Sequence, residues 1–128
     1  MKKIVVLILS ILISFNSYGA WNFNSSSLEG DTFYLHDDSI KLENGYIYFW
    51  YLKNYLMPNK FGDMSSKVYV KGDCSKNRIK YLSYVWYPLP MGNGQGEISN
   101  KESEWEYPTP TSNGIDLLNE ACNNYVKI

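Results

Sequence analysis

The sequence is poor in the residues from which most catalytic and metal sites are built. It holds a single histidine, His36, and two cysteines among 128 residues. One histidine excludes a His-based metal cluster and leaves any Ser-His-Asp arrangement dependent on that residue. His36 precedes Asp37 and Asp38, which allows weak metal contact. Because other ligands are scarce, we expect instead a surface histidine at the end of a strand and no metal site.

Two further motifs suggest chemistry but lack its full pattern. Glu102, Glu104 and Glu106 form an acidic row, yet glycoside hydrolysis requires carboxylates that the fold holds at a set separation. We expect this row to be a solvated surface. The three glycines at alternate positions in 91–96 resemble a phosphate loop without its Lys-Ser/Thr ending, so we expect a flexible loop. The sequence therefore predicts a protein that is not an enzyme and has no cofactor.

The chain also lacks an apolar run of the about 20 residues that a membrane-spanning helix needs. Its apolar segment covers only residues 4–13, after Lys2 and Lys3, and Ser17 and Gly19 then place small residues at positions −3 and −1 of a cleavage site. This layout is typical of a secretory signal peptide over residues 1–19, and a retained membrane anchor is the alternative. We expect a mature chain that begins at Ala20, is exported, and has no stable membrane anchor.

The expected mature chain, residues 20–128, is long enough for one small domain with a single core. Removal of two lysines with the signal leaves 10 Lys and Arg against 13 Asp and Glu, a net charge near −3. That charge is not typical of a protein that binds nucleic acid or anionic membranes. Aromatic residues make up 16% of the sequence, with twelve tyrosines, which favours half-buried sheet surfaces and adhesive patches.

The two cysteines, Cys74 and Cys122, are expected to form a disulfide. An exported protein meets an oxidising compartment, where an even pair of cysteines is usually bridged. The alternative is a reactive thiol pair, but the spacing is not CxxC and no histidine flanks either residue.

Several segments have the pattern of β-strands. Residues 67–74 alternate between apolar and polar side chains, and residues 46–55 are apolar or aromatic on both faces, which predicts a central strand covered on both sides. For residues 78–87 we expect Leu82, Tyr84 and Trp86 on one face and Ile79, Tyr81, Val85 and Tyr87 on the other. Further strands are expected at 21–23 and 31–36, a helical turn at 40–42, and an irregular segment at 99–111 anchored by Trp105 and Tyr107.

The C-terminal segment has the pattern of a helix. Ser112 or Asn113 can cap it, and Asp116 lies in its first turn, where the helix dipole favours an acid. Ile115, Leu118, Cys122 and Tyr125 form one stripe, which directs Cys122 to the core. The predicted fold is α+β: an antiparallel sheet of five to six strands with one packed C-terminal helix, joined by the disulfide.

One charged cluster is a candidate binding site. Half of the mature positive charge falls within fourteen residues, at Lys67, Lys71, Lys76, Arg78 and Lys80, and Tyr69 shares a face with Lys67 and Lys71. If the two strands pair as a hairpin, they form a basic surface that bears a tyrosine. Such a surface suits an acidic glycoprotein or glycosaminoglycan. The alternative is a solvated sheet face, or lysines that protect a sheet edge.

An ordered set of short motifs resembles the bacterial surface-adhesin protein E family over nearly all of the mature chain. The set comprises Tyr48-Phe49-Trp50, Ser65-Ser66-Lys67, Asp73-Cys74, Arg78-Ile79-Lys80, the glycine-spaced run 91–96, residues 105–110 and a terminal helix with Cys122. The resemblance implies an antiparallel sheet with a packed C-terminal helix, and a Cys74–Cys122 bridge.

The resemblance also implies adhesion, because the family's namesake is an outer-membrane lipoprotein that binds host matrix proteins and can dimerise. Lipoproteins carry an acylated cysteine at the mature amino terminus, where this sequence has Ala20, so we expect no lipid anchor. Two hypotheses follow. The first is an exported binding module for matrix glycoproteins such as vitronectin or laminin, with a homodimer as one possible state. The second is a soluble periplasmic accessory or inhibitor protein that acts on a bacterial partner.

Overall fold

The computed structural model describes residues 21–125 of the chain. The expected signal peptide, its cleavage site and the predicted new amino terminus at Ala20 lie outside the described residues. Within residues 21–125, no helix has the length and apolar character needed to cross a membrane.

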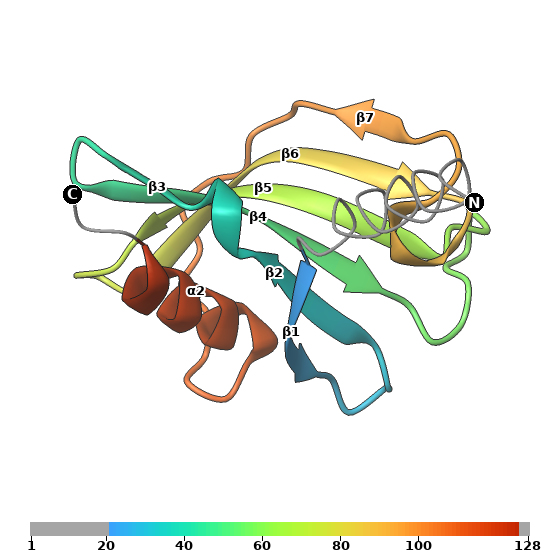
Figure 1. Ribbon diagram of the computed structural model, residues 1–128, viewed down its shortest axis with the longest axis horizontal. Coiled ribbons are helices and arrows are strands. Elements are labelled where there is room, and N and C mark those ends of the chain that lie inside the picture. Colours follow the sequence, from blue (N-terminus) through green and yellow to red (C-terminus); the bar gives the residue numbers. More distant parts are fainter. Residues whose placement is uncertain (1–20, 126–128) are drawn as a thin grey trace, which may run out of the picture.

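The described chain folds into one antiparallel sheet and a single long helix. The sheet order is β1-β2-β4-β5-β6-β7, and the short strand β3 pairs with β4 beside this path (Figure 1). The strands are β1 (Trp21–Ser26), β2 (Thr32–His36), β3 (Lys41–Glu43), β4 (Tyr46–Asn54), β5 (Ser65–Asp73), β6 (Arg78–Tyr87) and β7 (Glu97–Ser99); the helix is α2 (Asn113–Asn124), and two 3-10 turns are η1 (Asp37–Ser39) and η2 (Pro90–Gly92). The predicted fold class is therefore confirmed, with one strand more than expected.

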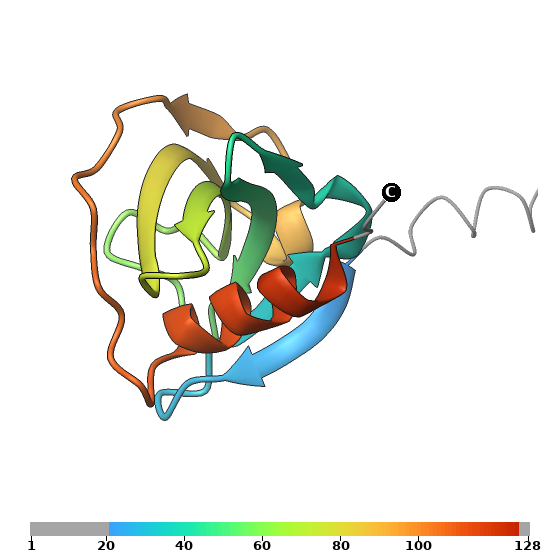
Figure 2. The ribbon, with the colours of Figure 1, turned by 90° about the vertical axis from the view of Figure 1, so that its left-hand side faces the viewer.

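Helix α2 packs against one face of the curved sheet, next to β1 (Figure 2). The Ser112 side chain caps the helix by accepting a hydrogen bond from the backbone N–H of Ile115 at 3.2 Å. Leu118 is fully buried, and Gly72 of β5 makes room for it: a Cβ atom on Gly72 would lie 2.6 Å from Leu118 Cδ1. The core between helix and sheet consists of buried side chains from both layers: Phe33, Leu35, Ile47, Phe49, Val68, Val70, Ile79, Ile115, Leu117, Leu118 and Ala121.

The predicted disulfide is confirmed. Cys74, directly after β5, is bonded to Cys122 in the last turn of α2, with a Cα–Cα distance of 6.0 Å. The bridge ties the C-terminal end of the helix to the turn between β5 and β6.

Two local predictions before β4 are wrong. Residues 40–42 do not form a helical turn; the 3-10 turn η1 comes earlier, and Lys41 begins strand β3. The reason is the following pair, Asn44 and Gly45, which both have positive φ values and form the tight turn of a β3–β4 hairpin. Strand β1 also extends to Ser26, beyond the expected end at residue 23.

The expected faces of β6 are wrong in its second half because the strand contains a bulge. Val70 pairs with Tyr81 and Tyr69 with Ser83, so Leu82 is the extra residue. The bulge reverses the alternation, and the rings of Tyr81 and Tyr84 lie on the same side with centroids 5.6 Å apart. Val85 and Tyr87 therefore lie on the face opposite α2, not with Ile79.

Candidate binding face

The face of the sheet opposite α2, here called the open face, carries most of the predicted site residues. Alternation along β5 places Val68 and Val70 under the helix and Lys67, Tyr69 and Lys71 on the open face. Strand β4 was expected to be covered on both sides. On the open face this holds at Leu52, which is fully buried, whereas Tyr46, Tyr48 and Trp50 are half-buried aromatic side chains.

The predicted basic hairpin is formed. Strands β5 and β6 pair so that Lys71 lies opposite Lys80 and Asp73 opposite Arg78. Lys76 is exposed in the connecting turn, apart from the four cations on the strands. The structure thus places every residue of the predicted cluster except Lys76 on the paired strands, with Lys71, Arg78 and Lys80 at one end of the hairpin and Lys67 toward the other.

Trp105 completes this end of the open face. Its ring centroid lies 4.1 Å from the Arg78 guanidinium carbon, 5.7 Å from Lys71 Nζ and 5.4 Å from Lys80 Nζ, and the Tyr46 ring lies 5.7 Å away. Three cations within about 6 Å of one indole ring are in the range of cation–π attraction. We call Tyr46, Lys71, Arg78, Lys80 and Trp105 the basic–aromatic patch.

Backbone pairing holds Trp105 in this position. The segment that carries it runs beside β6: Ser103 N–H donates to the Tyr81 carbonyl at 2.9 Å, and Glu106 and Ile79 exchange two hydrogen bonds at 2.8 and 2.9 Å. From the sequence, Trp105 was expected only to anchor an irregular segment. The other expected anchor, Tyr107, is 65% exposed.

The cations of the patch differ in their partners. Arg78 Nε binds Asp73 Oδ2 at 3.0 Å, and this pair is largely buried. Hydrogen bonds from Ser75, followed by that from Arg78, hold the pKa of the Asp73 carboxyl below its ordinary value of 3.8. Lys71 and Lys80 have no carboxylate within 4 Å among residues 21–125. Their charges are therefore available to an acidic group from outside.

Aromatic stacking connects the patch to the opposite end of the open face. The Tyr69 ring stacks on Tyr48 at 6.2 Å and lies 4.9 Å from Trp50. Beyond Trp50 lies a cavity of about 310 Å³, whose walls include Trp21, His36 and Lys67. The predicted cluster thus divides into two parts, with Lys67 at the cavity and the other strand cations at the patch.

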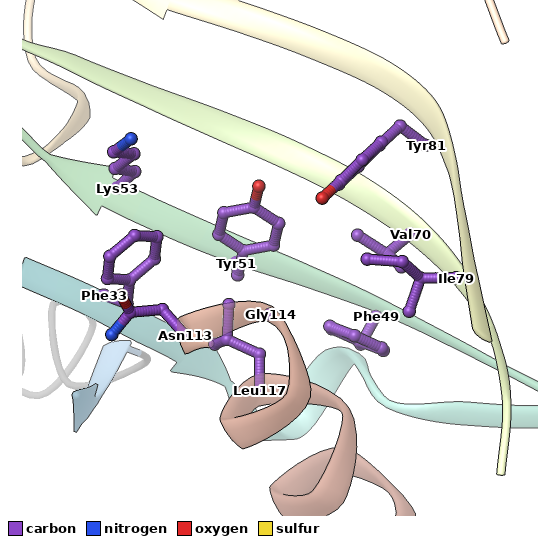
Figure 3. Close-up of a pocket in the computed structure, with 10 residues that line it drawn as sticks. All are labelled: Phe33, Phe49, Tyr51, Lys53, Val70, Ile79, Tyr81, Asn113, Gly114 and Leu117. Atoms are coloured by element: carbon purple, nitrogen blue, oxygen red, sulfur yellow. The ribbon is translucent and has the colours of Figure 1, made fainter. Parts of the chain in front are cut away.

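A second cavity, of about 240 Å³, lies on the helix side between the sheet and the start of α2 (Figure 3). The hydroxyl groups of Tyr51 and Tyr81 point toward one another there. Burial raises the pKa of both tyrosines. Lys53 at the rim forms an ion pair with Asp31 at 3.9 Å, so this cavity offers no unpaired cation.

The motifs set aside on chemical grounds do not assemble a site in the described part of the chain. No group of three His, Cys, Asp or Glu residues there can hold a metal ion. The row Glu102, Glu104 and Glu106 is exposed. Of the glycine run, Gly92 belongs to η2, and its N–H donates to the Ser65 hydroxyl at 2.8 Å, which folds this loop onto β5.

The fold is shared with solved structures of Haemophilus influenzae protein E. In its crystal form II, that protein has a TM-score of 0.65 and 17% sequence identity, over 84% of this chain and 90% of that one. A second structure of it has a TM-score of 0.62 and 15% identity, over 84% and 86% of the two chains. Identities this low show a common fold and nothing further.

No curated protein matches the sequence. The sequence profile of a family does match, over residues 21–123, which is nearly all of the described chain. The predicted resemblance is thereby confirmed: the chain belongs to the surface-adhesin protein E family.

Proposed function

We propose that the protein is an exported, non-enzymatic binding module that attaches to acidic segments of host matrix glycoproteins through the basic–aromatic patch. Membership of an adhesin family supports a binding role over a catalytic one. The observation that carries the proposal is the arrangement at one end of the open face. Lys71 and Lys80 lie opposite each other and beside the Trp105 ring, and neither has a carboxylate partner within residues 21–125.

The chemistry of the patch suits a protein partner. Indole and phenol rings supply contact area at a small entropic cost, and cations with no internal partner steer acidic surfaces toward them. Arginine and aromatic residues are enriched at the centres of interfaces, where most of the binding energy is concentrated. The Arg78–Asp73 pair fixes the hairpin end beneath these groups, so the patch is ordered before it binds.

The test compares two double variants that remove the same charge. Lys71→Ala with Lys80→Ala changes the patch, whereas Lys60→Ala with Lys101→Ala changes exposed lysines in the loops after β4 and β7. Binding to immobilised laminin and vitronectin is measured at several salt concentrations. We expect the patch variant to bind roughly tenfold more weakly, since it loses two exposed ion pairs that contribute up to about 1 kcal/mol each, and about 1.4 kcal/mol corresponds to a factor of ten. We also expect its affinity to fall less steeply with salt.

Equal binding by the two variants would show that the basic–aromatic patch is not the binding site. If the unaltered protein binds neither glycoprotein, the host-matrix role is wrong.

The compartment is tested separately, by cell fractionation and by protease treatment of intact cells. A surface adhesin must be accessible to the protease. Recovery from the periplasm alone would contradict adhesion and favour the second hypothesis, an accessory or inhibitor protein with a bacterial partner.

A further inference from the structure

The cavity at the far end of the open face is built around a single cation. Its aromatic walls come from three strands: Trp21 of β1, Trp50 of β4 and Tyr87 of β6. The sheet is curved (Figure 2), and Trp21 of β1 and Tyr87 of β6 line the same cavity although β2, β4 and β5 lie between their strands. Lys67 Nζ is 5.6 Å from the centroid of the Trp21 ring and 5.1 Å from that of Tyr87.

The side chain of Lys67 is held in place by the loop after β6. A Cβ atom on Gly92 would lie 2.6 Å from Lys67 Cε, so the loop backbone packs directly on the lysine stem. Ser65 fixes this loop, because its hydroxyl donates to the Leu89 carbonyl at 2.6 Å and accepts from Gly92 N–H at 2.8 Å. A cation that is positioned in advance loses little entropy when an anion binds.

The charge of Lys67 has no internal counterpart. The described residues form two ion pairs, those of Lys53 and Arg78, and no carboxylate lies within 4 Å of Lys67. His36 also lines the cavity, and its buried Nδ1 atom has no hydrogen-bond partner among residues 21–125. The cavity therefore favours a ligand that carries an anionic group.

The side chains that line the cavity determine which chemical group can accompany the anionic group of the ligand. Trp21, Trp50, Tyr87 and Val85 present mainly apolar surface. A sugar ring has more hydroxyl groups than the few polar side chains of the cavity, His36, Ser39 and Lys67, can satisfy, and burying the remaining hydroxyl groups against apolar walls is unfavourable. A flat aromatic ring packs well against indole and phenol rings. We infer that this cavity binds small aromatic carboxylates, with the ring between Trp21 and Trp50 and the carboxylate at Lys67 Nζ.

This site is distinct from the basic–aromatic patch. Lys67 and Lys71 are four residues apart along β5, about 13 Å at the usual rise of a strand. The inference goes beyond the proposed function and uses none of the patch residues. The patch variant with Lys71→Ala and Lys80→Ala should therefore keep the small-molecule site.

The experiment compares an acid with its neutral amide. Indole-3-acetate and indole-3-acetamide have the same ring, and glucuronate carries a carboxylate on a sugar. Binding is measured by calorimetry and by NMR shifts of the tryptophan indole N–H signals. We expect indole-3-acetate to bind about fivefold or more tightly than the amide, to bind more tightly than glucuronate, and to shift the signals of Trp21 and Trp50.

Two lysine variants locate the anion. Lys67→Met keeps the aliphatic stem and removes the charge, and it should abolish the preference for the acid over the amide. Lys71→Met is the matched control and should retain that preference. Near-ultraviolet circular dichroism checks that both variants are folded.

Several results would overturn the inference: no binding of indole-3-acetate, equal affinity for acid and amide, a preference that persists in Lys67→Met, or tighter binding of glucuronate. The acid–amide comparison on the unaltered protein decides the matter even if Lys67→Met fails to fold. Loss of matrix-protein binding in the patch variant bears only on the proposed function, so the two proposals can fail separately.

Discussion

Removal of the disulfide should lower the free energy of unfolding by an amount that depends on the sequence separation of its two cysteines. Cys74 and Cys122 are 48 residues apart in the sequence, so the bond closes a large loop in the unfolded chain. The loss of loop-closure entropy corresponds to about 4 kcal/mol at 25 °C. Cys74 is exposed and Cys122 is half-buried, so serine at both positions buries little new polar surface. The double variant Cys74→Ser with Cys122→Ser therefore reports mainly on the lost link.

The assay is urea denaturation of the oxidised protein and of the double variant, followed by tryptophan fluorescence. With a denaturant slope of about 1.5 kcal/mol per molar, a loss of about 4 kcal/mol lowers the midpoint by roughly 2.7 M. The unaltered protein measured in a reducing agent is the control and should match the double variant. A loss below about 1 kcal/mol, or no response to reduction, would refute the argument that the bridge carries a large share of the stability.

Two further predictions concern residues beside the bridge. Gly72→Ala places a Cβ atom 2.6 Å from Leu118 Cδ1, so we expect a loss of about 1–3 kcal/mol in urea denaturation, and an unchanged midpoint would show that the helix adapts without cost. The lowered pKa of Asp73, which results from its bonds to Ser75 and Arg78, stabilises the fold above pH 3.8, and this contribution disappears as the pH falls through the folded-state pKa. The stability difference between the unaltered protein and Asp73→Asn should therefore shrink between pH 5 and pH 2; a constant difference would contradict this role for the carboxylate.

The parts of the fold that follow from local pattern could be predicted from the sequence. The alternation of Val68 and Val70 with lysines identified β5 and its buried face, and the capped stripe from Ile115 to Tyr125 identified α2. The bulge at Leu82 could not be predicted in this way, because it is defined by pairing with another strand. Strand β3 was missed although Asn44 and Gly45 are a strong hairpin signal, since three residues alone show little periodicity.

The candidate site was also predictable only in part, because contacts between distant segments leave no local pattern in the sequence. Sequence spacing placed the lysines of β5 and the cations of β6 on one hairpin. It did not place Trp105 beside them, because backbone pairing between Glu106 and Ile79 brings in a segment more than twenty residues away. At the other end of the open face, Trp21 reaches the cavity around Lys67 only because the whole sheet is curved. Sequence spacing does not show this curvature. The sequence showed only that cations and aromatic residues are concentrated on these strands. It indicated a basic, aromatic sheet face, but not the division of that face into the patch and the cavity.

The organisation of that face follows from the position of helix α2 on the opposite side of the sheet. Helix α2 and the disulfide cover one side of the sheet, and in residues 21–125 no second layer covers the other. The half-buried aromatic side chains on the open face instead pack on one another and on lysine and arginine stems. A cation held against a ring keeps its charge at the surface, so the contacts that shield the sheet from water also create the two candidate binding sites. Because the stack of Tyr48, Tyr69 and Trp50 separates these sites by more than 10 Å, substitutions at one should leave the other unchanged.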